Sequence, residues 1–158
     1  MKRTILSIAL LLGITSFASA QLSVSKTPKM ETFSKVSMLG VVRMEMFRGV
    51  NGTDTTYMLS YVNNAFKQST KNESFFLKAS TQDMLTLEQL MLDVLKNKDS
   101  DENVSVKIGE KDYYLHRTST MGFPSLMLVH SADYDYTLLA EKEIKKIFAP
   151  FHGDKKKK

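Results

Sequence analysis

The chain has 158 residues, no cysteine and a formal net charge of +5 at pH 7. Without cysteine the protein can form neither a disulfide nor a thiolate zinc site, and it cannot be a cysteine-anchored lipoprotein. The positive charge lies at the two ends, because residues 21–153 contain sixteen basic and sixteen acidic side chains. Nucleic-acid-binding domains usually concentrate basic side chains within the fold, so we expect no nucleic-acid partner.

Residues 1–20 have the pattern of a cleavable signal peptide. Two basic residues precede an apolar run over residues 5–17, and the tripeptide Ala18-Ser19-Ala20 forms a small-residue cleavage site. The apolar run is shorter than the roughly 20 residues that a transmembrane helix needs. We therefore expect an exported protein, periplasmic or extracellular, whose mature chain starts at Gln21 and contains no transmembrane segment.

The mature chain is expected to form one domain over residues 36–152. A polar segment over residues 21–35 is interpreted as a leader, and residues 153–158 as a disordered lysine-rich tail. The domain begins with three segments that alternate apolar and polar residues, which is typical of half-buried strands. These segments cover residues 36–49, 55–64 and 74–80, and the pair Asn51-Gly52 marks a turn between the first two.

The periodicity then changes to that of a helix. Apolar residues recur with helical spacing from Leu87 to Leu95, and Thr86 with Gln89 three residues later predicts a capping box at the start. The second half repeats this order, with strands expected over residues 103–108, 112–119 and 124–131. A helix over residues 140–148 follows, and Pro150 is expected to end it.

These patterns predict an α+β fold of about six antiparallel strands, arranged as two strand-strand-strand-helix halves with both helices packed on one face. Similar segments recur at a spacing of 51 to 54 residues, so an internal duplication and two unrelated halves both remain open. The residues expected in the core are Leu59, Tyr61, Phe76, Leu87, Leu90, Val94, Val106, Leu128, Ile144 and Ile147.

An acidic cluster after the first helix has part of the spacing of a calcium-binding loop. Asp99, Asp101, Asn103 and Glu110 occupy positions 1, 3, 5 and 12 of such a loop. Position 6, which normally is glycine, is the β-branched Val104, and the residues after it alternate as a strand does. We therefore expect a solvated connection here, while a weaker calcium site made from Asp99, Asp101 and Asn103 remains open.

One other segment concentrates groups that hold metals or transfer protons. His130, Asp133 and Asp135 lie close together in the sequence, and His116 lies on the preceding predicted strand. If the strands brought these four together, they could form a metal-dependent site with hydrolytic activity. The alternative is an ordinary strand end followed by a polar turn, and no characteristic metal-binding spacing connects the histidines.

Aromatic residues on the predicted strands provide the leading candidate for a binding surface. The rings expected to form an exposed strip are Tyr57, Tyr61, Tyr113, Tyr134 and Tyr136. An exposed aromatic strip is suited to a protein, peptide or glycan partner, although the same rings could instead pack between sheet and helices.

The sequence therefore predicts an exported, non-enzymatic binding module without a cofactor. It contains neither a Gly-x-Ser-x-Gly elbow nor a glycine-rich phosphate loop. The first alternative is the metal-dependent site described above. The second is a membrane-surface protein that anionic lipid attracts through the lysines at residues 155–158.

Overall fold

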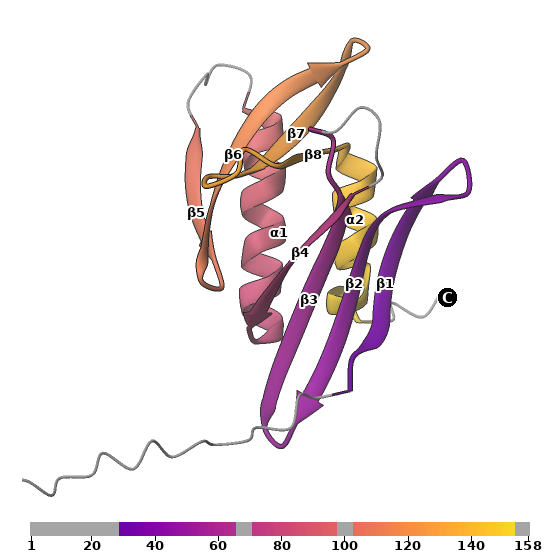
Figure 1. Cartoon of the computed structure of the whole chain (residues 1–158), viewed down its shortest axis with the longest axis vertical. Coiled ribbons are helices and arrows are strands. Elements are labelled where there is room, and N and C mark those ends of the chain that lie inside the picture. The colour runs from indigo at the N-terminus through magenta and orange to yellow at the C-terminus, as the bar shows by residue number, and fades with distance from the viewer. Residues whose placement is uncertain (1–28, 66–70, 98–102, 154–158) are drawn as a thin grey trace, which may run out of the picture.

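A computed structural model describes residues 29–65, 71–97 and 103–153. The expected signal peptide, most of the expected leader and the lysine tail lie outside these residues. The described residues form two four-stranded antiparallel sheets and two α-helices (Figure 1). None of the helices in the described part of the chain is long and apolar enough to span a membrane.

Each half of the chain contributes one sheet and then one helix. The first half contains β1 (Glu31–Met38), β2 (Val41–Asn51), β3 (Asp54–Val62), β4 (Asn72–Lys78) and α1 (Thr81–Lys96). The second half contains β5 (Val104–Ile108), β6 (Lys111–Thr120), β7 (Phe123–His130), β8 (Tyr136–Leu139) and α2 (Glu141–Phe148), followed by the 3₁₀ helix η1 (Ala149–His152). Within each sheet the spatial order of the strands equals their order in the chain.

The α+β class and the two similar halves are confirmed, but each half has four strands instead of three. The strands that sequence analysis missed are β1 and β8, which are edge strands. In β1 only Val36 is fully buried, so the strand lacks a clear alternation, and it begins inside the expected leader. β8 has four residues, too few for a periodic pattern to stand out.

The two helices exchange sheets. α1 follows the first sheet in the chain but packs mainly on β6 and β7 of the second sheet, whereas α2 packs mainly on β1 and β2 of the first. The helices also contact each other, and Figure 1 shows α1 beside the second sheet and α2 beside the first. Neither half therefore buries the apolar face of its own sheet, and the two halves form one cooperative core.

The start of α1 differs from the prediction. The helix begins at Thr81, five residues before the predicted cap, because Ser80 and Asp83 form the capping box. The Ser80 hydroxyl accepts a hydrogen bond from Asp83 N–H at 3.2 Å, and the Asp83 carboxylate accepts one from Ser80 N–H at 2.8 Å. The Ser80 hydroxyl also donates a hydrogen bond to the Asp83 carboxylate at 2.7 Å, and this bond together with the one from Ser80 N–H lowers the pKa of the Asp83 carboxyl.

The buried face of α1 is also rotated relative to the predicted stripe. Its fully buried residues are Met84, Glu88, Met91, Leu92 and Leu95, whereas Leu87, Leu90 and Val94 of the predicted core are only partly buried. The rotation follows from an acidic residue that sequence patterning assigns to solvent. Glu88 is buried because His152 Nε2 lies 2.6 Å from its carboxylate, and this pair joins η1 to α1.

Most of the other predicted core residues are buried as expected. Leu59, Tyr61, Leu128, Ile144 and Ile147 are buried, and Val106 is partly buried. The prediction for Phe76 is wrong, since it is 55% exposed and its neighbour Phe75 is buried opposite Leu59 of β3. Adjacent strand residues face opposite sides, and Leu77 two residues later could have indicated that Phe75 is on the inner face.

Two irregularities in the pairing of β1 with β2 reorient side chains. The register shifts by one residue at two places, which leaves Phe33 of β1 and Arg43 of β2 without a partner across the strands. A β-bulge bends its strand and redirects the extra side chain. Phe33 packs against Tyr57 and Phe151, with ring centroids 5.9 and 5.1 Å apart, whereas Arg43 reaches the second half of the protein.

The turn between β5 and β6 contacts the backbone of β4. Gly109 has φ +64°, and a Cβ atom there would overlap the carbonyl oxygen of Phe76. Gly52, in the turn between β2 and β3, has nearly the same φ of +62° but open space around it. The first sheet and the second therefore meet at Gly109 with no room for a side chain.

We expect Gly109→Ala to lower the free energy of unfolding by about 3 kcal/mol or more, because it adds a steric overlap to the cost of a positive φ. Gly52→Ala is the matched control and should lose only about 1 kcal/mol, the cost of the backbone conformation alone. Urea unfolding of both variants measures the difference. Equal losses would show that the close approach of the two sheets at Gly109 is unimportant.

Candidate functional site

A cavity of about 1090 Å³ lies at one end of the molecule, between the two halves. This is the end where α1 finishes, α2 begins, and the β1–β2 and β6–β7 hairpins turn (Figure 1). Its apolar lining comes from several elements and includes Met38, Leu95, Met121, Phe123, Pro124, Leu138 and Ala140. The cavity therefore combines an apolar wall with the ends of both helices.

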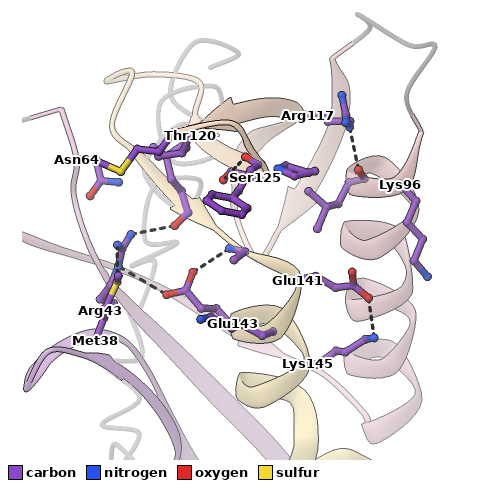
Figure 2. A pocket seen from close by; sticks show the side chains of 17 residues that line it. Met38, Arg43, Asn64, Lys96, Arg117, Thr120, Ser125, Glu141, Glu143 and Lys145 are labelled. Atoms are coloured by element: carbon purple, nitrogen blue, oxygen red, sulfur yellow. Dashed lines mark hydrogen bonds and ion pairs between the residues drawn. The ribbon is translucent and has the colours of Figure 1, made fainter.

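Arg43 connects the first sheet to the second half at the wall of this cavity (Figure 2). Its Nη2 donates a hydrogen bond to the carbonyl oxygen of Leu138 at 3.0 Å, and its Nε lies 3.9 Å from the Glu143 carboxylate. Glu143 also accepts a hydrogen bond from Ala140 N–H at 2.8 Å, which caps the start of α2. One arginine thus holds β8 and the first turn of α2 against β2.

The other charged groups give the cavity an excess of positive charge. Its described lining contains five basic side chains and two acidic ones, although residues 21–153 as a whole are neutral. Lys145 lies 2.6 Å from Glu141 and lowers the pKa of that carboxyl. Lys142 forms no ion pair with any residue that the structure describes.

Arg117 is fixed at the far side of the cavity by the end of α1. Its Nε donates a hydrogen bond to the carbonyl oxygen of Leu95 at 3.0 Å (Figure 2). The last carbonyls of a helix carry partial negative charge and lack partners within the helix. The backbone oxygen therefore orients the guanidinium without neutralising its charge.

The lining residues do not assemble a catalytic site. They include the hydroxyls of Thr120 and Ser125 but no histidine, and both glutamates are engaged with Arg43 or Lys145. The Ser125 hydroxyl donates a 3.4 Å hydrogen bond to the Phe123 carbonyl oxygen. A nucleophilic serine needs an adjacent base, and none of the described lining residues supplies one.

The residues of the predicted metal-dependent site are only partly brought together. His130 Nδ1 lies 3.1 Å from the Asp133 carboxylate, and His130 N–H donates to the Asp135 carbonyl oxygen at 2.8 Å. His116 is separated from them, because His130 pairs with Tyr113 and thus lies on the opposite face of the sheet from His116. Among the described residues no group of three or more His, Asp or Glu side chains could hold a metal ion.

The candidate calcium ligands lie partly beyond the described chain. Asp99 and Asp101 lie outside the described residues, and Asn103 is exposed immediately before β5. Residues Val104–Ile108 form the strand β5, and Glu110 lies in the turn that follows. The helix that follows a calcium loop is therefore replaced here by a β-hairpin.

The five tyrosines of the predicted binding strip do not share one surface. Tyr57, Tyr61 and Tyr113 are buried in the core, Tyr136 is partly buried on β8, and Tyr134 is exposed in the turn before β8. The buried rings have core partners: Phe75 lies 6.3 Å from Tyr61 and 5.1 Å from Tyr113, between ring centroids. The rings of Tyr61, Phe75 and Tyr113 thus connect the two sheets, and they are not accessible to a partner.

The side chains of Tyr61 and Tyr113 influence each other's pKa within this core. Burial raises the pKa of both phenols, and Glu73 and Asp135 nearby raise it further. The pKa of Tyr113 rises to about 12, and that of Tyr61 rises well beyond its ordinary value. The folded protein therefore strongly favours the neutral form of both groups.

Comparison with known proteins does not assign this arrangement to a family. No protein-family model matches the chain, and no curated protein matches its sequence. The function therefore has to be argued from the geometry of the chain itself.

Sequence analysis missed the residues that line the cavity, although one of them, Met121, had a readable signal, as did Leu39 in the neighbouring hairpin turn. Leu39-Gly40 and Met121-Gly122 occupy hairpin turns in which Asn-Gly or Asp-Gly is usual. An apolar residue in such a turn is unusual enough to be noticed. The bulge at Arg43 had no such signal, because it depends on the pairing register of β1 with β2.

We expect Arg43→Met to lower the free energy of unfolding by about 1–3 kcal/mol, because Leu138 and Glu143 would lose a charged partner. Arg48→Met on the same strand is the control. Arg48 lies 4.6 Å over the Phe33 ring, and its loss should cost about 0.5–1 kcal/mol. Urea unfolding measures both, and an equal or larger loss for Arg48→Met would contradict this role of Arg43.

We expect stability to fall as the pH rises from about 10 towards 12, because unfolded tyrosines ionise near pH 10 whereas Tyr113 in the folded state does not ionise until about pH 12. Ultraviolet titration of tyrosinate should show a late stage that coincides with unfolding. Tyr61→Phe together with Tyr113→Phe should reduce the amplitude of that stage. A late stage unchanged by the double substitution would contradict the assignment.

Proposed function

We propose that this protein is an exported, non-catalytic binding protein that holds an elongated apolar molecule with an anionic end group in the cavity between its two halves. The observation that supports this proposal most directly is the cavity itself, with its mainly apolar wall and excess of basic side chains. Export is supported by the signal-like pattern of residues 1–20.

The size and lining of the cavity favour a small amphipathic ligand. Ligand pockets usually measure about 300–1,000 Å³ and are predominantly apolar, with a few polar groups that fix orientation. Leu95, Leu138 and Ala140 provide apolar wall on the side of the two helices. A glycan would bring many hydroxyl groups that need hydrogen-bond partners, and this wall offers few of them.

The placement of charge favours an anionic end group. Lys142 and Arg117 are both without a carboxylate partner among the described residues, and both line the cavity. The positive field at the cavity is local, since the body of the protein is neutral. A carboxylate or phosphate next to these groups would gain charge-assisted hydrogen bonds.

The metal-dependent alternative has less support. Among the four residues of that site, the only side-chain contact in the described structure is between His130 and Asp133, and it stabilises the turn before β8. The alternative that depends on the lysine tail concerns residues 155–158, which lie outside the described chain, and it stays a prediction.

The proposal predicts that dodecanoate binds saturably to residues 21–158, which contain every described element of the fold. Dodecylammonium, which has a cationic end group, should bind at least about tenfold more weakly than dodecanoate. Ala140→Phe should abolish binding, because it fills the cavity at a position with extended backbone and no side-chain capping hydrogen bond to lose. Calorimetry below the micellar concentration measures each affinity, with dodecanol as the neutral reference.

Two lysine variants separate the charged part of the site from general attraction. Lys142→Gln should weaken dodecanoate binding several-fold and leave the affinity for dodecanol unchanged. Lys107→Gln, at an exposed position of β5 away from the cavity lining, should change neither affinity. The proposal would be rejected if no amphiphile binds saturably, or if Ala140→Phe binds dodecanoate as tightly as the unchanged protein.

A further inference from the structure

Exposed apolar side chains are concentrated in two hairpin tips. The first tip comprises residues 38–42 between β1 and β2, and the second comprises residues 120–124 between β6 and β7. Of the ten large hydrophobic residues that are exposed in the described structure, six lie in these tips. They are Met38, Leu39, Val41, Val42, Met121 and Phe123. Both tips lie at the same end of the molecule, the upper end in Figure 1.

The backbone of both tips is strained by the apolar residue that it presents. Leu39 and Met121 have φ values of +50° and +52°, although each is followed by a glycine. Gly40 and Gly122 also have positive φ, +81° each, so both central residues of each tip are left-handed, as in a type I′ turn. In the turns after β2 and β5 the positive φ falls on Gly52 and Gly109 alone. L-residues other than Asn and Asp avoid this conformation. Leu39 and Met121 are nevertheless 95% and 94% exposed, so packing of their side chains within the described protein does not offset the strain.

Basic side chains flank the tips. Lys96 at the end of α1 and Lys142 at the start of α2 are exposed and line the cavity that opens beside both tips. The acidic residues of the same region, Glu141 and Glu143, are paired with Lys145 and Arg43. This end of the described molecule thus presents two apolar hairpin tips and two exposed basic side chains.

We propose that the two hairpin tips dock the protein on an anionic lipid bilayer, with Leu39 and Met121 inserted at the level of the headgroups and Lys96 and Lys142 beside the lipid phosphates. Apolar side chains buried in the interface and basic side chains near anionic lipid add to each other in such binding. Phe123 lies where an aromatic ring is favoured at the membrane interface. Docking does not depend on the ligand of the cavity.

The shape of the tips favours a bilayer over a protein partner. A stable protein interface buries about 800 Å² on each side of a closely complementary surface. Two separate tips, each ending in one flexible apolar side chain, do not provide such a continuous surface. A bilayer accepts inserted side chains without requiring a matching shape, and it places negative charge around them.

Tryptophan variants test insertion directly, because the chain contains no tryptophan. Leu39→Trp and Met121→Trp each introduce one fluorophore at a tip, and Val50→Trp is the matched control, since Val50 is 57% exposed near the β2–β3 turn at the other end (Figure 1). With vesicles of phosphatidylglycerol and phosphatidylcholine, the two tip variants of residues 21–158 should shift their emission to the blue. Brominated lipids should quench the tip fluorophores and leave Trp at position 50 unquenched.

Aspartate variants test the energetic contribution of each tip. Leu39→Asp and Met121→Asp should each weaken vesicle binding about tenfold, since a charge replaces an inserted apolar side chain. Asp tolerates a positive φ, so thermal unfolding should show unchanged or higher stability, and misfolding would not explain the loss. Val50→Asp should bind as the unchanged protein does, and binding should weaken at high salt or on pure phosphatidylcholine.

Three outcomes would overturn the docking proposal: no binding to the anionic vesicles, equal losses for Leu39→Asp and Val50→Asp, or loss of binding only on deletion of residues 155–158. The last outcome would assign binding to the lysine tail. If the tryptophan emission of the tip variants shifted to the blue on addition of a protein but not on addition of lipid vesicles, the tips would bind a protein partner, and the proposed bilayer docking would be rejected. Leu39 does not line the cavity, so Leu39→Asp should retain dodecanoate binding, and each proposal can fail without the other.

Discussion

The structure depends on the exchange of helices between its two sheets. Each half supplies a sheet whose inner face is covered mainly by the helix of the other half. Small domains depend on burying enough apolar surface to offset the conformational entropy of the chain, and here neither half does so alone. With no cysteine to cross-link the halves, this shared core and the polar contacts at its rim hold the domain together.

The cavity is a consequence of the same exchange. Its wall combines Met38 and Arg43 of the first sheet, the last turn of α1, strand β6 and the first turn of α2. The bulge that frees Arg43 from strand pairing allows it to reach Leu138 and Glu143, so a local irregularity of β2 fixes the position of the opposite wall. The cavity and the contact between the halves are therefore built from the same residues, and a change in one affects the other.

Sequence patterning predicted the parts of this fold whose periodicity is strong. The helix α2, the central strands and the order of elements in each half followed from alternation and helical spacing. The edge strands β1 and β8 did not, because partial burial weakens alternation in one and the other is short. Phe76 was misassigned and the burial of Glu88 was not predicted, because tertiary partners decide their burial: the register with Leu59 places Phe75 inside, and His152 stabilises Glu88 there.

The candidate site was less predictable than the fold. A strip of tyrosines could be read from the sequence, but the position of each ring depends on which sheet face the helices cover, and three of them are core residues. The cavity involves residues as far apart as Met38 and Lys145, and no local pattern connects them. The apolar turn residues Leu39 and Met121 were visible in the sequence, yet their meaning depends on both turns lying at one end of the molecule.

The exchange of helices also determines when the chain can become protease-resistant during its synthesis or translocation. A chain that emerges with its N-terminus first completes β1 to β4 early, but α2 and Phe151, which cover β1 and Tyr57, are among its last residues. The apolar face of the first sheet therefore stays open until α2 has emerged, which exposes it to holdase chaperones until then. A premature stop before Glu141 would leave that face uncovered, so quality control should recognise fragments that end after β8 as readily as much shorter ones.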